Sequence, residues 1–246
     1  MMTDKNIVTP YLSEEGKKEQ VTQMFDRIAP RYDLLNRVLS LGVDVWWRKT
    51  ALSLLKEKKP RRLLDVATGT ADVAMLAANM LHPEHITGID ISNQMLDFGR
   101  VKIKKQGLTD VITLETGDSE QLRFEDESFD AVTVAFGVRN FEHLEKGLSE
   151  MRRVLRSGGT IVILEFSRPH VFPFKQLYNT YFKYVLPWIG RLTSRDTRAY
   201  TYLFESVQAF PDGDHFLDIL KKTGYSHPIC RRLTLGICSI YTAQKP

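Results

Sequence analysis

The chain has 246 residues, a formal net charge of +4 and a pI near 9.0, with 43% hydrophobic and 26% charged residues. This composition is ordinary for a globular protein that buries a full core, and its mild basicity permits contact with nucleic acid or an anionic lipid surface but requires neither. Two cysteines at this length exclude a disulfide scaffold. The first residues are polar, and no uncharged apolar stretch reaches about 18 residues, so we expect neither a secretory signal nor a membrane span. We therefore expect a cytoplasmic protein.

The first predicted elements are helices. Between residues 17 and 55 the apolar residues recur at helical spacing, and Pro30 and Gly42, which end or bend helices, interrupt the pattern. We therefore divide the chain into a helical extension over residues 1–56, which could fold over a site as a lid, and a main domain over residues 57–246.

Strands and helices alternate in the main domain. Apolar runs predict strands at 62–67, 85–91, 111–117, 129–136 and 160–166, with helices between them that include 71–80 and 145–155. We expect Ser157, Gly158 and Gly159 to end the second of these helices as a C-cap followed by a turn. Residues 228–245 predict two further strands around Gly236. The alternation indicates an α/β fold, a doubly wound and mostly parallel seven-stranded sheet with an antiparallel C-terminal hairpin.

An aromatic-rich insertion, residues 167–210, interrupts the alternation. Within it, residues 171–192 mix aromatic and basic side chains, a combination that suits the headgroup boundary of a membrane. The same segment could instead cap the sheet or form a dimer contact. Both interpretations remain open from the sequence.

The turn after the first predicted strand is expected to bind a nucleotide-like ligand. The strand reaches Asp65, and the chain then turns through Thr68 and Gly69 into a helix whose N-terminus offers free N–H groups at the carboxyl edge of the sheet. A dinucleotide-binding fold would carry G-x-G-x-x-G here, whereas this turn reads A-T-G-T-A-D. A single glycine suits a ligand that has no pyrophosphate.

Acidic residues follow the next two strands. Asp90 ends the second strand, where a carboxylate can accept hydrogen bonds from both ribose hydroxyls. Asp118 and Ser119 follow the third strand, where a carboxylate can accept a bond from the adenine amino group. Each acid alone is more often a strand-end or capping residue, but their places after successive strands favour an adenosine derivative with a zwitterionic tail. S-adenosyl-L-methionine fits this description.

Three longer stretches carry a more specific resemblance. The sequences FDRIAPRYDLLNRVLSLGVDVWWRK, FGVRNFEHLEKGLSEMRRVLRSGGTIVILEFSRP and YLFESVQAFP closely resemble the UbiE/MenG family of class I S-adenosylmethionine-dependent methyltransferases. Those enzymes C-methylate the ring of a polyprenyl quinol in menaquinone or ubiquinone synthesis. The resemblance therefore implies methyl transfer to demethylmenaquinol, or alternatively to a benzoquinol. Carried over by position, the cofactor contacts are Thr68, Asp90, Asp118 and Ser119.

The chain departs from the family pattern at a few positions. Relatives commonly carry glycine where Ala71 stands, and generic methyltransferases also carry glycine where Ala67 and Thr70 stand. We expect a helical φ at Ala71, so that this replacement costs little. Many relatives carry a serine that contacts the ligand where Ala135 stands, so that contact is in question here.

The loop after the fourth strand, FGVRN, is expected to carry the chemistry. Carbon methylation needs a group that stabilises a phenolate and a proton acceptor. Arg139 could stabilise the phenolate or orient a water, with a surface ion pair as the structural alternative, and Asn140 could fix the ring oxygen. His143 is an alternative base. Tyr32 and Asp33 of the N-terminal extension could close over the site.

Other functional classes fit parts of the pattern. Enzymes that methylate amino groups of nucleic-acid bases carry an Asn/Asp-Pro-Pro-aromatic stretch where this chain has FGVRNF. A cytosine C5 methyltransferase needs a nucleophilic cysteine near the same place, and the two cysteines of this chain, Cys230 and Cys238, lie far along the sequence. A non-catalytic binding module would have no reason to join a cofactor pocket to this polar loop. We therefore expect a polyprenyl quinol partner, no nucleic acid and no metal, and favour menaquinone as the product. Association with the inner face of the membrane and a homodimer are left open.

Overall fold

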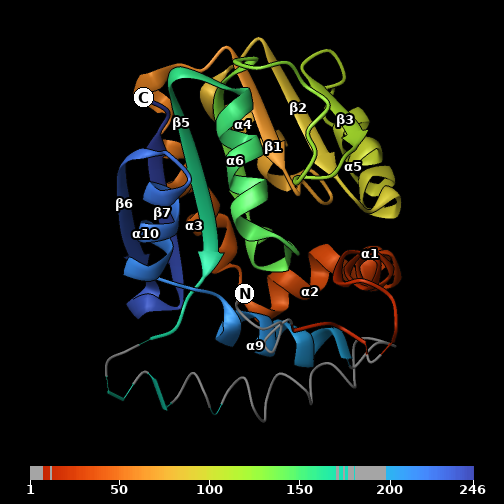
Figure 1. Cartoon of the computed structure of the whole chain (residues 1–246). Helices are drawn as coiled ribbons and strands as arrows, with labels where there is room; N and C mark the ends of the chain where they lie inside the picture. The colour runs from red at the N-terminus through yellow and green to blue at the C-terminus, as the bar shows by residue number, and fades with distance from the viewer. Residues whose placement is uncertain (1–7, 12, 170–171, 174, 177–179, 181–197) are drawn as a thin grey trace.

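The computed structural model describes residues 8–11, 13–169, 172–173, 175–176, 180 and 198–246. One seven-stranded sheet has the order β3-β2-β1-β4-β5-β7-β6 (Figure 1). The strands are β1 Arg62–Val66, β2 His85–Asp90, β3 Ile112–Thr116, β4 Phe129–Ala135, β5 Leu155–Phe166, β6 Ser226–Leu233 and β7 Cys238–Gln244. The first five strands are parallel, and β7 pairs antiparallel with both β5 and β6. The predicted fold class is confirmed.

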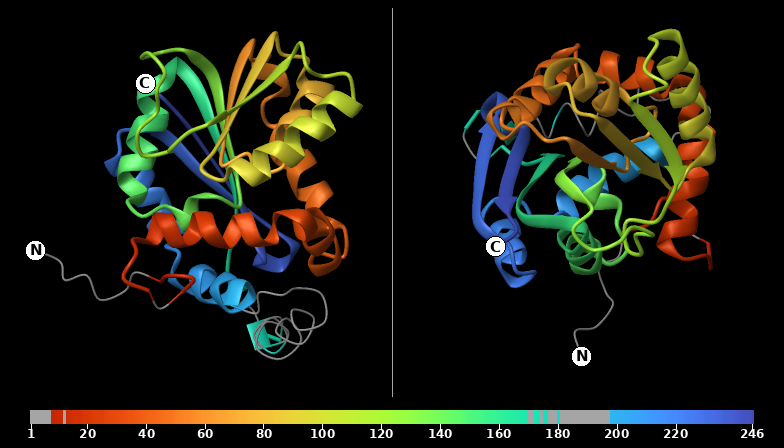
Figure 2. Two further views of the ribbon diagram at one scale, coloured as in Figure 1. Left: turned by 90° about the vertical axis from the view of Figure 1, so that its right-hand side faces the viewer. Right: turned by 90° about the horizontal axis from the view of Figure 1, so that it is seen from above.

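Helices cover both faces of the sheet. The helices are α1 Lys17–Ile28, α2 Tyr32–Leu39, α3 Val43–Ser53, α4 Asp72–Leu81, α5 Asn93–Lys105, α6 Leu144–Val154, α9 Arg198–Ala209 and α10 Asp214–Lys222, with short 3₁₀ helices η1 Ala29–Arg31, η2 Lys56–Lys58, η3 Val138–Asn140 and η5 Thr234–Gly236. One buried apolar cluster joins α3, α4 and α5 to one face of the sheet, and a second joins α6 and α10 to the other. Figure 2 shows the sheet between these two layers.

Of the helices in the described part of the chain, three lie beyond the carboxyl ends of the parallel strands instead of on a face. These are α1, α2 and α9 (Figure 1). Val21 and Met24 of α1 pack against Tyr202 of α9 in a third buried cluster. Because the carboxyl edge is where open α/β sheets bind their ligands, these helices cover the edge at which a site is expected.

Helix α6 ends within one residue of its predicted end, but the predicted C-cap by Ser157, Gly158 and Gly159 is wrong. The helix ends at Val154, and Leu155 is already extended, with φ −70° and ψ 141°. Strand β5 therefore begins at Leu155 and contains the Ser-Gly-Gly segment as an irregularity, since Phe129 pairs with Leu155 while Ala131 pairs with Thr160. Pairing with β4 directly after the helix removes the need for a glycine C-cap.

The turn between β1 and α4 is more strained than expected. The φ of Ala71 is +65°, so the prediction of a helical φ there is wrong, and Ala67 and Gly69 also have positive φ values of +53° and +56°. An alanine in this left-handed region costs about 1–2 kcal/mol. The Thr68 N–H donates to the Ile89 carbonyl at 2.9 Å and anchors the turn. The turn is therefore held in shape by its surroundings, as is common where a loop serves a site.

The aromatic-rich insertion is described only in part. Its described portion includes α9. Most of residues 171–192 falls outside the described residues, so whether that segment contacts a membrane, caps the sheet or forms a dimer contact stays a prediction. Within the described part of the chain, no helix is long and apolar enough to cross a membrane.

Candidate functional site

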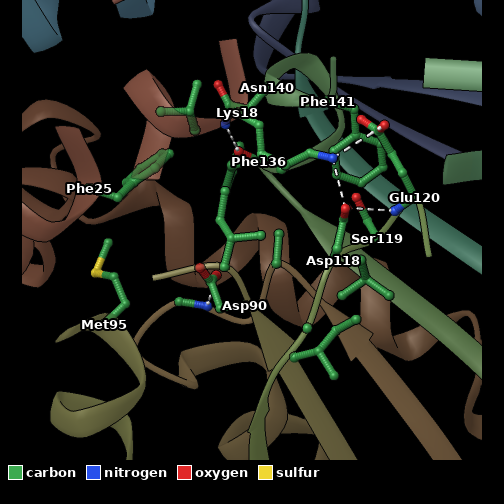
Figure 3. A pocket seen from close by; sticks show the side chains of 18 of the residues that line it. Lys18, Phe25, Asp90, Met95, Asp118, Ser119, Glu120, Phe136, Asn140 and Phe141 are labelled. Carbon is green, nitrogen blue, oxygen red and sulfur yellow. Dashed lines mark hydrogen bonds and ion pairs between the residues drawn. The ribbon is translucent and has the colours of Figure 1, made fainter. Parts of the chain in front are cut away.

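A cavity of about 670 Å³, partly open to solvent, lies at the carboxyl edge of the sheet beside Gly69. Its walls come from α1, from the first residues of α2, and from the loops that follow β1, β2, β3 and β4. Figure 3 shows Asp90, Asp118, Asn140 and Phe25 among the side chains around it.

The Asp90 carboxylate is fixed at the base of this cavity. One of its oxygens accepts the N–H of Gly69 at 2.8 Å, and the other accepts the N–H of Ser92 at 2.9 Å. Burial raises the pKa of Asp90 to about 6, and the backbone donors oppose that rise. Each carboxylate oxygen has a second lone pair, so the group can still accept hydrogen bonds from a ligand.

Asp65 and Thr68 lie beneath the turn, outside the lining of the main cavity. The buried Asp65 carboxylate accepts hydrogen bonds from the hydroxyls of Thr68 and Thr133, both at 2.6 Å. Burial raises the pKa of Asp65 to about 6. Both residues line a smaller adjoining cavity together with Gly69 and Tyr32. The structure thus gives Asp65 and Thr68 a role in supporting the turn, and their direct contact with a ligand stays a prediction.

Asp118 and Ser119 line the main cavity on the side of β3, as their positions predict. The Asp118 carboxylate forms an ion pair with Lys18 of α1 at 2.7 Å and accepts the N–H of Glu120 at 2.9 Å (Figure 3). Lys18 was not predicted. It stands on a helix 100 residues away in the chain, and the helical pattern of α1 carries no signal of this contact.

The neighbouring Lys17 binds the opposite wall. Its ammonium donates to the carbonyls of Arg139 at 3.2 Å and Phe141 at 2.9 Å. Burial lowers the pKa of Lys17 to about 8, and the nearby carboxylate of Glu142 opposes the fall. The first turn of α1 therefore joins the loop after β3 to the loop after β4, and the cavity lies between them.

The predicted catalytic loop is only partly at the cavity. Asn140 lines it, and its Oδ1 is buried without a hydrogen-bond partner among the described residues. The Arg139 guanidinium points away from the lining and forms a buried ion pair with Glu165 of β5 at 2.9 Å. Its Nη1 also donates to the Phe136 carbonyl at 2.5 Å. Arg139 is thus in a buried ion pair instead of the surface pair considered from the sequence.

Tyr32 lies at the cavity, whereas His143 does not. Tyr32 lines both cavities, and burial raises the pKa of its hydroxyl. His143 is exposed at the N-terminus of α6 and does not line the main cavity. Its backbone N–H donates to Glu120 at 2.9 Å, which fixes the chain there with the ring in solvent. The structure does not bring His143 to the other predicted site residues.

A polar network ties α2 to the strained turn. The hydroxyl of Thr70 donates to Asp33 at 2.6 Å, and Lys102 of α5 donates to Asp33 at 2.7 Å and also to Asp72. The N-terminal extension is therefore bonded directly to the turn that carries Gly69. Among the described residues there is no cluster of three His, Cys, Asp or Glu side chains that could hold a metal ion.

Comparisons with known proteins agree with this arrangement. Residues 13–245 match the ubiE/COQ5 methyltransferase family. The chain is 50% identical over 238 residues to a Bacteroides fragilis protein named demethylmenaquinone methyltransferase, with 97% of each chain covered. It is 46% identical over 235 residues to a Geotalea daltonii protein named ubiquinone/menaquinone biosynthesis C-methyltransferase UbiE, covering 95% of this chain and 99% of that one.

The fold also matches solved structures. A Haemonchus contortus phosphoethanolamine N-methyltransferase 2 in complex with S-adenosyl-L-methionine aligns with a TM-score of 0.59 at 18% identity, covering 80% of this chain and 52% of that chain. At this identity, the likeness concerns the fold alone.

The buried Asp65 carboxyl makes stability depend on pH. Its folded-state pKa of about 6 lies above the ordinary value of 3.8, so the folded state binds the proton more tightly and loses stability as pH rises from about 4 to about 6. Asp65→Asn keeps hydrogen-bond partners for both threonine hydroxyls, which can rotate, and removes the buried charge. In urea unfolding, we expect the free energy of unfolding of Asp65→Asn relative to wild type to rise by about 2 kcal/mol between pH 4 and pH 7. Asp218→Asn, at an exposed position of α10, is the control. A difference in the free energy of unfolding between Asp65→Asn and wild type that does not change with pH would contradict the prediction.

Proposed function

Because the chain belongs to the ubiE/COQ5 methyltransferase family, we propose that it transfers a methyl group from S-adenosyl-L-methionine to a ring carbon of demethylmenaquinol and so produces menaquinol. The observation that carries this proposal is the 50% identity, over 97% of each chain, to the Bacteroides fragilis protein named demethylmenaquinone methyltransferase. The name of the Geotalea daltonii relative includes ubiquinone biosynthesis, which makes a benzoquinol the second candidate substrate.

The cavity fits the proposed cofactor. An adenosine derivative with an amino-acid tail needs a carboxylate for the ribose, a polar group for the adenine and a turn that lets a ligand approach the backbone. Asp90 would accept hydrogen bonds from the ribose hydroxyls, and Asp118 would accept one from the adenine amino group. Gly69, buried with a positive φ at the mouth of the turn, allows the close approach. The apolar side chains of Phe25 and Met95 complete this side of the cavity.

The chemistry requires little covalent participation by the protein. When bound, S-adenosyl-L-methionine supplies an electrophilic methyl group on a sulfonium. The quinol carbon becomes nucleophilic when the adjacent hydroxyl is deprotonated or nearly so. After methylation, the ring carbon gives its proton to a base, which restores aromaticity. The residues of the chain must therefore orient the ring, hold the phenolate oxygen and exclude water.

Asn140 is the residue best placed to hold the quinol oxygen. Asn140 lines the cavity, its Nδ2 donates a long hydrogen bond of 3.5 Å to the Phe136 carbonyl, and its buried Oδ1 has no partner among the described residues. The Nδ2 could therefore donate to a quinol oxygen, and the Oδ1 could accept from a quinol hydroxyl. The Arg139–Glu165 ion pair fixes the same loop from behind. We propose Asn140 as the direct contact and Arg139, through its ion pair with Glu165, as the residue that positions it.

The nucleic-acid alternatives receive no support from the described site. The two cysteines stand on β6 and β7, and neither lines the main cavity. A cytosine C5 mechanism would need a cysteine at that position.

The N-terminal extension is proposed to act as a lid. Lys17, Lys18 and Tyr32 come from α1 and α2 and border the site, and Asp33 bonds to the turn that carries Gly69. Helices α1 and α2 are the part of the extension that can open for exchange of ligands and exclude water when closed, because α3 is packed in the buried core against the sheet. A polyprenyl substrate is insoluble in water, so we also propose that the enzyme meets it at a membrane surface.

The proposed activity is tested by methyl transfer. Purified enzyme is incubated with methyl-labelled S-adenosyl-L-methionine and either demethylmenaquinol or the corresponding demethyl benzoquinol, and products are identified by mass spectrometry. We expect the label on the naphthoquinol ring. Labelling of the benzoquinol alone would select the second candidate, and labelling of neither would reject both.

The cofactor assignment predicts the effect of Asp90→Ala. Loss of the carboxylate leaves the ribose hydroxyls without an acceptor, so the Kd for S-adenosyl-L-methionine should rise by about 5- to 150-fold, equivalent to about 1–3 kcal/mol. Calorimetry on the folded variant measures this, with circular dichroism to verify the fold. Asp97→Ala, at an exposed position of α5, is the matched control. Equal affinity in Asp90→Ala and wild type would place the cofactor elsewhere.

The role of Asn140 predicts a different kinetic signature. If its Nδ2 donates a hydrogen bond to the developing phenolate, Asn140→Ala should lower kcat by about 10²–10³-fold while the Kd for the cofactor stays near the wild-type value. Asn79→Ala on α4, outside the cavity lining, is the matched control. A wild-type kcat in Asn140→Ala would return this residue to a purely structural role.

A further inference from the structure

The corner where α2 meets α3 exposes large apolar side chains. The exposed fractions are 63% for Leu34, 42% for Val38, 89% for Leu41 and 51% for Trp46. Single exposed apolar residues are common on soluble proteins, but several within one short segment mark an interaction surface. These four residues are called the corner patch below.

The helices do not need the corner patch for their own packing. Leu35 of α2 is buried, and Trp47 of α3 is buried against Phe136 and Phe166. These inward residues attach the corner to the body of the protein. Leu34 and Val38 follow the spacing i, i+4 and so lie on one side of α2, and Leu41 lies in the turn after the helix. That side faces solvent although it is apolar.

The charge around the corner patch is positive. Residues 31–49 carry four basic side chains, Arg31, Arg37, Arg48 and Lys49, against two carboxylates. Asp33 pairs with Lys102, and the buried Asp44 pairs with both Arg48 and Arg37, so the net charge of this stretch stays positive. Exposed leucine and tryptophan side chains among arginine and lysine suit the boundary of an anionic bilayer, where rings and cations both find partners.

This charge also argues against a second copy of the chain as the occupant. A two-fold dimer contact brings the same patch of both subunits together. The cations around the patch would then face each other, and like charges across an interface oppose association. An anionic lipid surface complements both the apolar residues and the cations.

The corner patch lies close to the entrance of the site. Tyr32, two residues before Leu34, lines the main cavity, and Asp33 is bonded to the turn that carries Gly69. Figure 1 shows α2 at the carboxyl edge of the sheet, beside α1. A quinol whose tail stays in the bilayer would have a short path from this corner to the cavity.

We propose that the corner patch docks the enzyme on anionic lipid bilayers, with Leu34, Leu41 and Trp46 at the headgroup level and the surrounding cations against lipid phosphates. The reason for docking rests on the proposed function, because a polyprenyl quinol resides in lipid. Binding to lipid itself can be measured without any methyl transfer.

The first experiment measures vesicle binding by co-sedimentation. Phosphatidylcholine vesicles are compared with mixed phosphatidylcholine–phosphatidylglycerol vesicles, using full-length wild type, Leu41→Ser/Trp46→Ser and the control Phe98→Ser/Val101→Ser. The control residues are similarly exposed on α5, at 41% and 53%. We expect wild type and control to prefer the anionic vesicles and the corner variant to lose binding by about tenfold or more. Equal binding by all three proteins, or none by wild type, overturns the proposal.

The second experiment uses the fluorescence of Trp46 to detect contact of the corner patch with lipid. Tryptophan emission of wild type should shift to shorter wavelength on anionic vesicles, and Trp46→Phe should abolish the shift. Methyl transfer to a short-tailed soluble quinol should be unchanged in the corner variant, while transfer to a long-tailed quinol in vesicles should fall. If wild type does not bind vesicles but is a dimer, and the corner variant is a monomer, the corner patch is instead a subunit interface. If no quinol is methylated but vesicle binding follows the corner patch, the proposed function fails and the docking surface stands.

Discussion

The site depends on one buried carboxylate. Asp90 accepts the backbone N–H groups of Gly69 and Ser92, so it joins the turn after β1 to the start of α5. Burying the charge is unfavourable, as the raised pKa of this group records. Only an ionised side chain with two oxygens can accept from both donors and still offer lone pairs to a ligand. The strained conformations of Ala67 and Ala71 persist because this anchor and the Thr68–Ile89 bond hold the turn.

Around this anchor, cations assemble walls from segments that are distant in the chain. Lys17 and Lys18 connect α1 to the loops after β4 and β3, and Arg139 connects the loop after β4 to β5 through Glu165. Buried or half-buried ion pairs contribute little net stability, because desolvation offsets the attraction. Their effect here is geometric. They set the distance between two loops, so the width of the cavity depends on where α1 lies.

Much of this protein was determined by local sequence pattern. Apolar runs of strand length that alternate with helical patterns require a parallel sheet with both faces covered, and the structure has that sheet. The carboxyl ends of parallel strands meet at one edge, so Asp90 and Asp118 could be placed together without coordinates. Asn140 and Tyr32 followed from the stretches that resemble the family, and both line the cavity.

Tertiary structure alone decided the partners of the charged groups and the conformations of the turn. No periodicity links Lys18 to Asp118, 100 residues away, or turns Arg139 toward Glu165 while His143 faces solvent. The positive φ at Ala71 likewise opposes local preference, and it persists because the hydrogen bonds of Gly69 to Asp90 and of Thr68 to Ile89 hold the turn in place. Local pattern fixes which residues share a face or an edge. The contacts between faces depend on how whole elements pack, and that packing places side chains from distant parts of the chain within bonding distance.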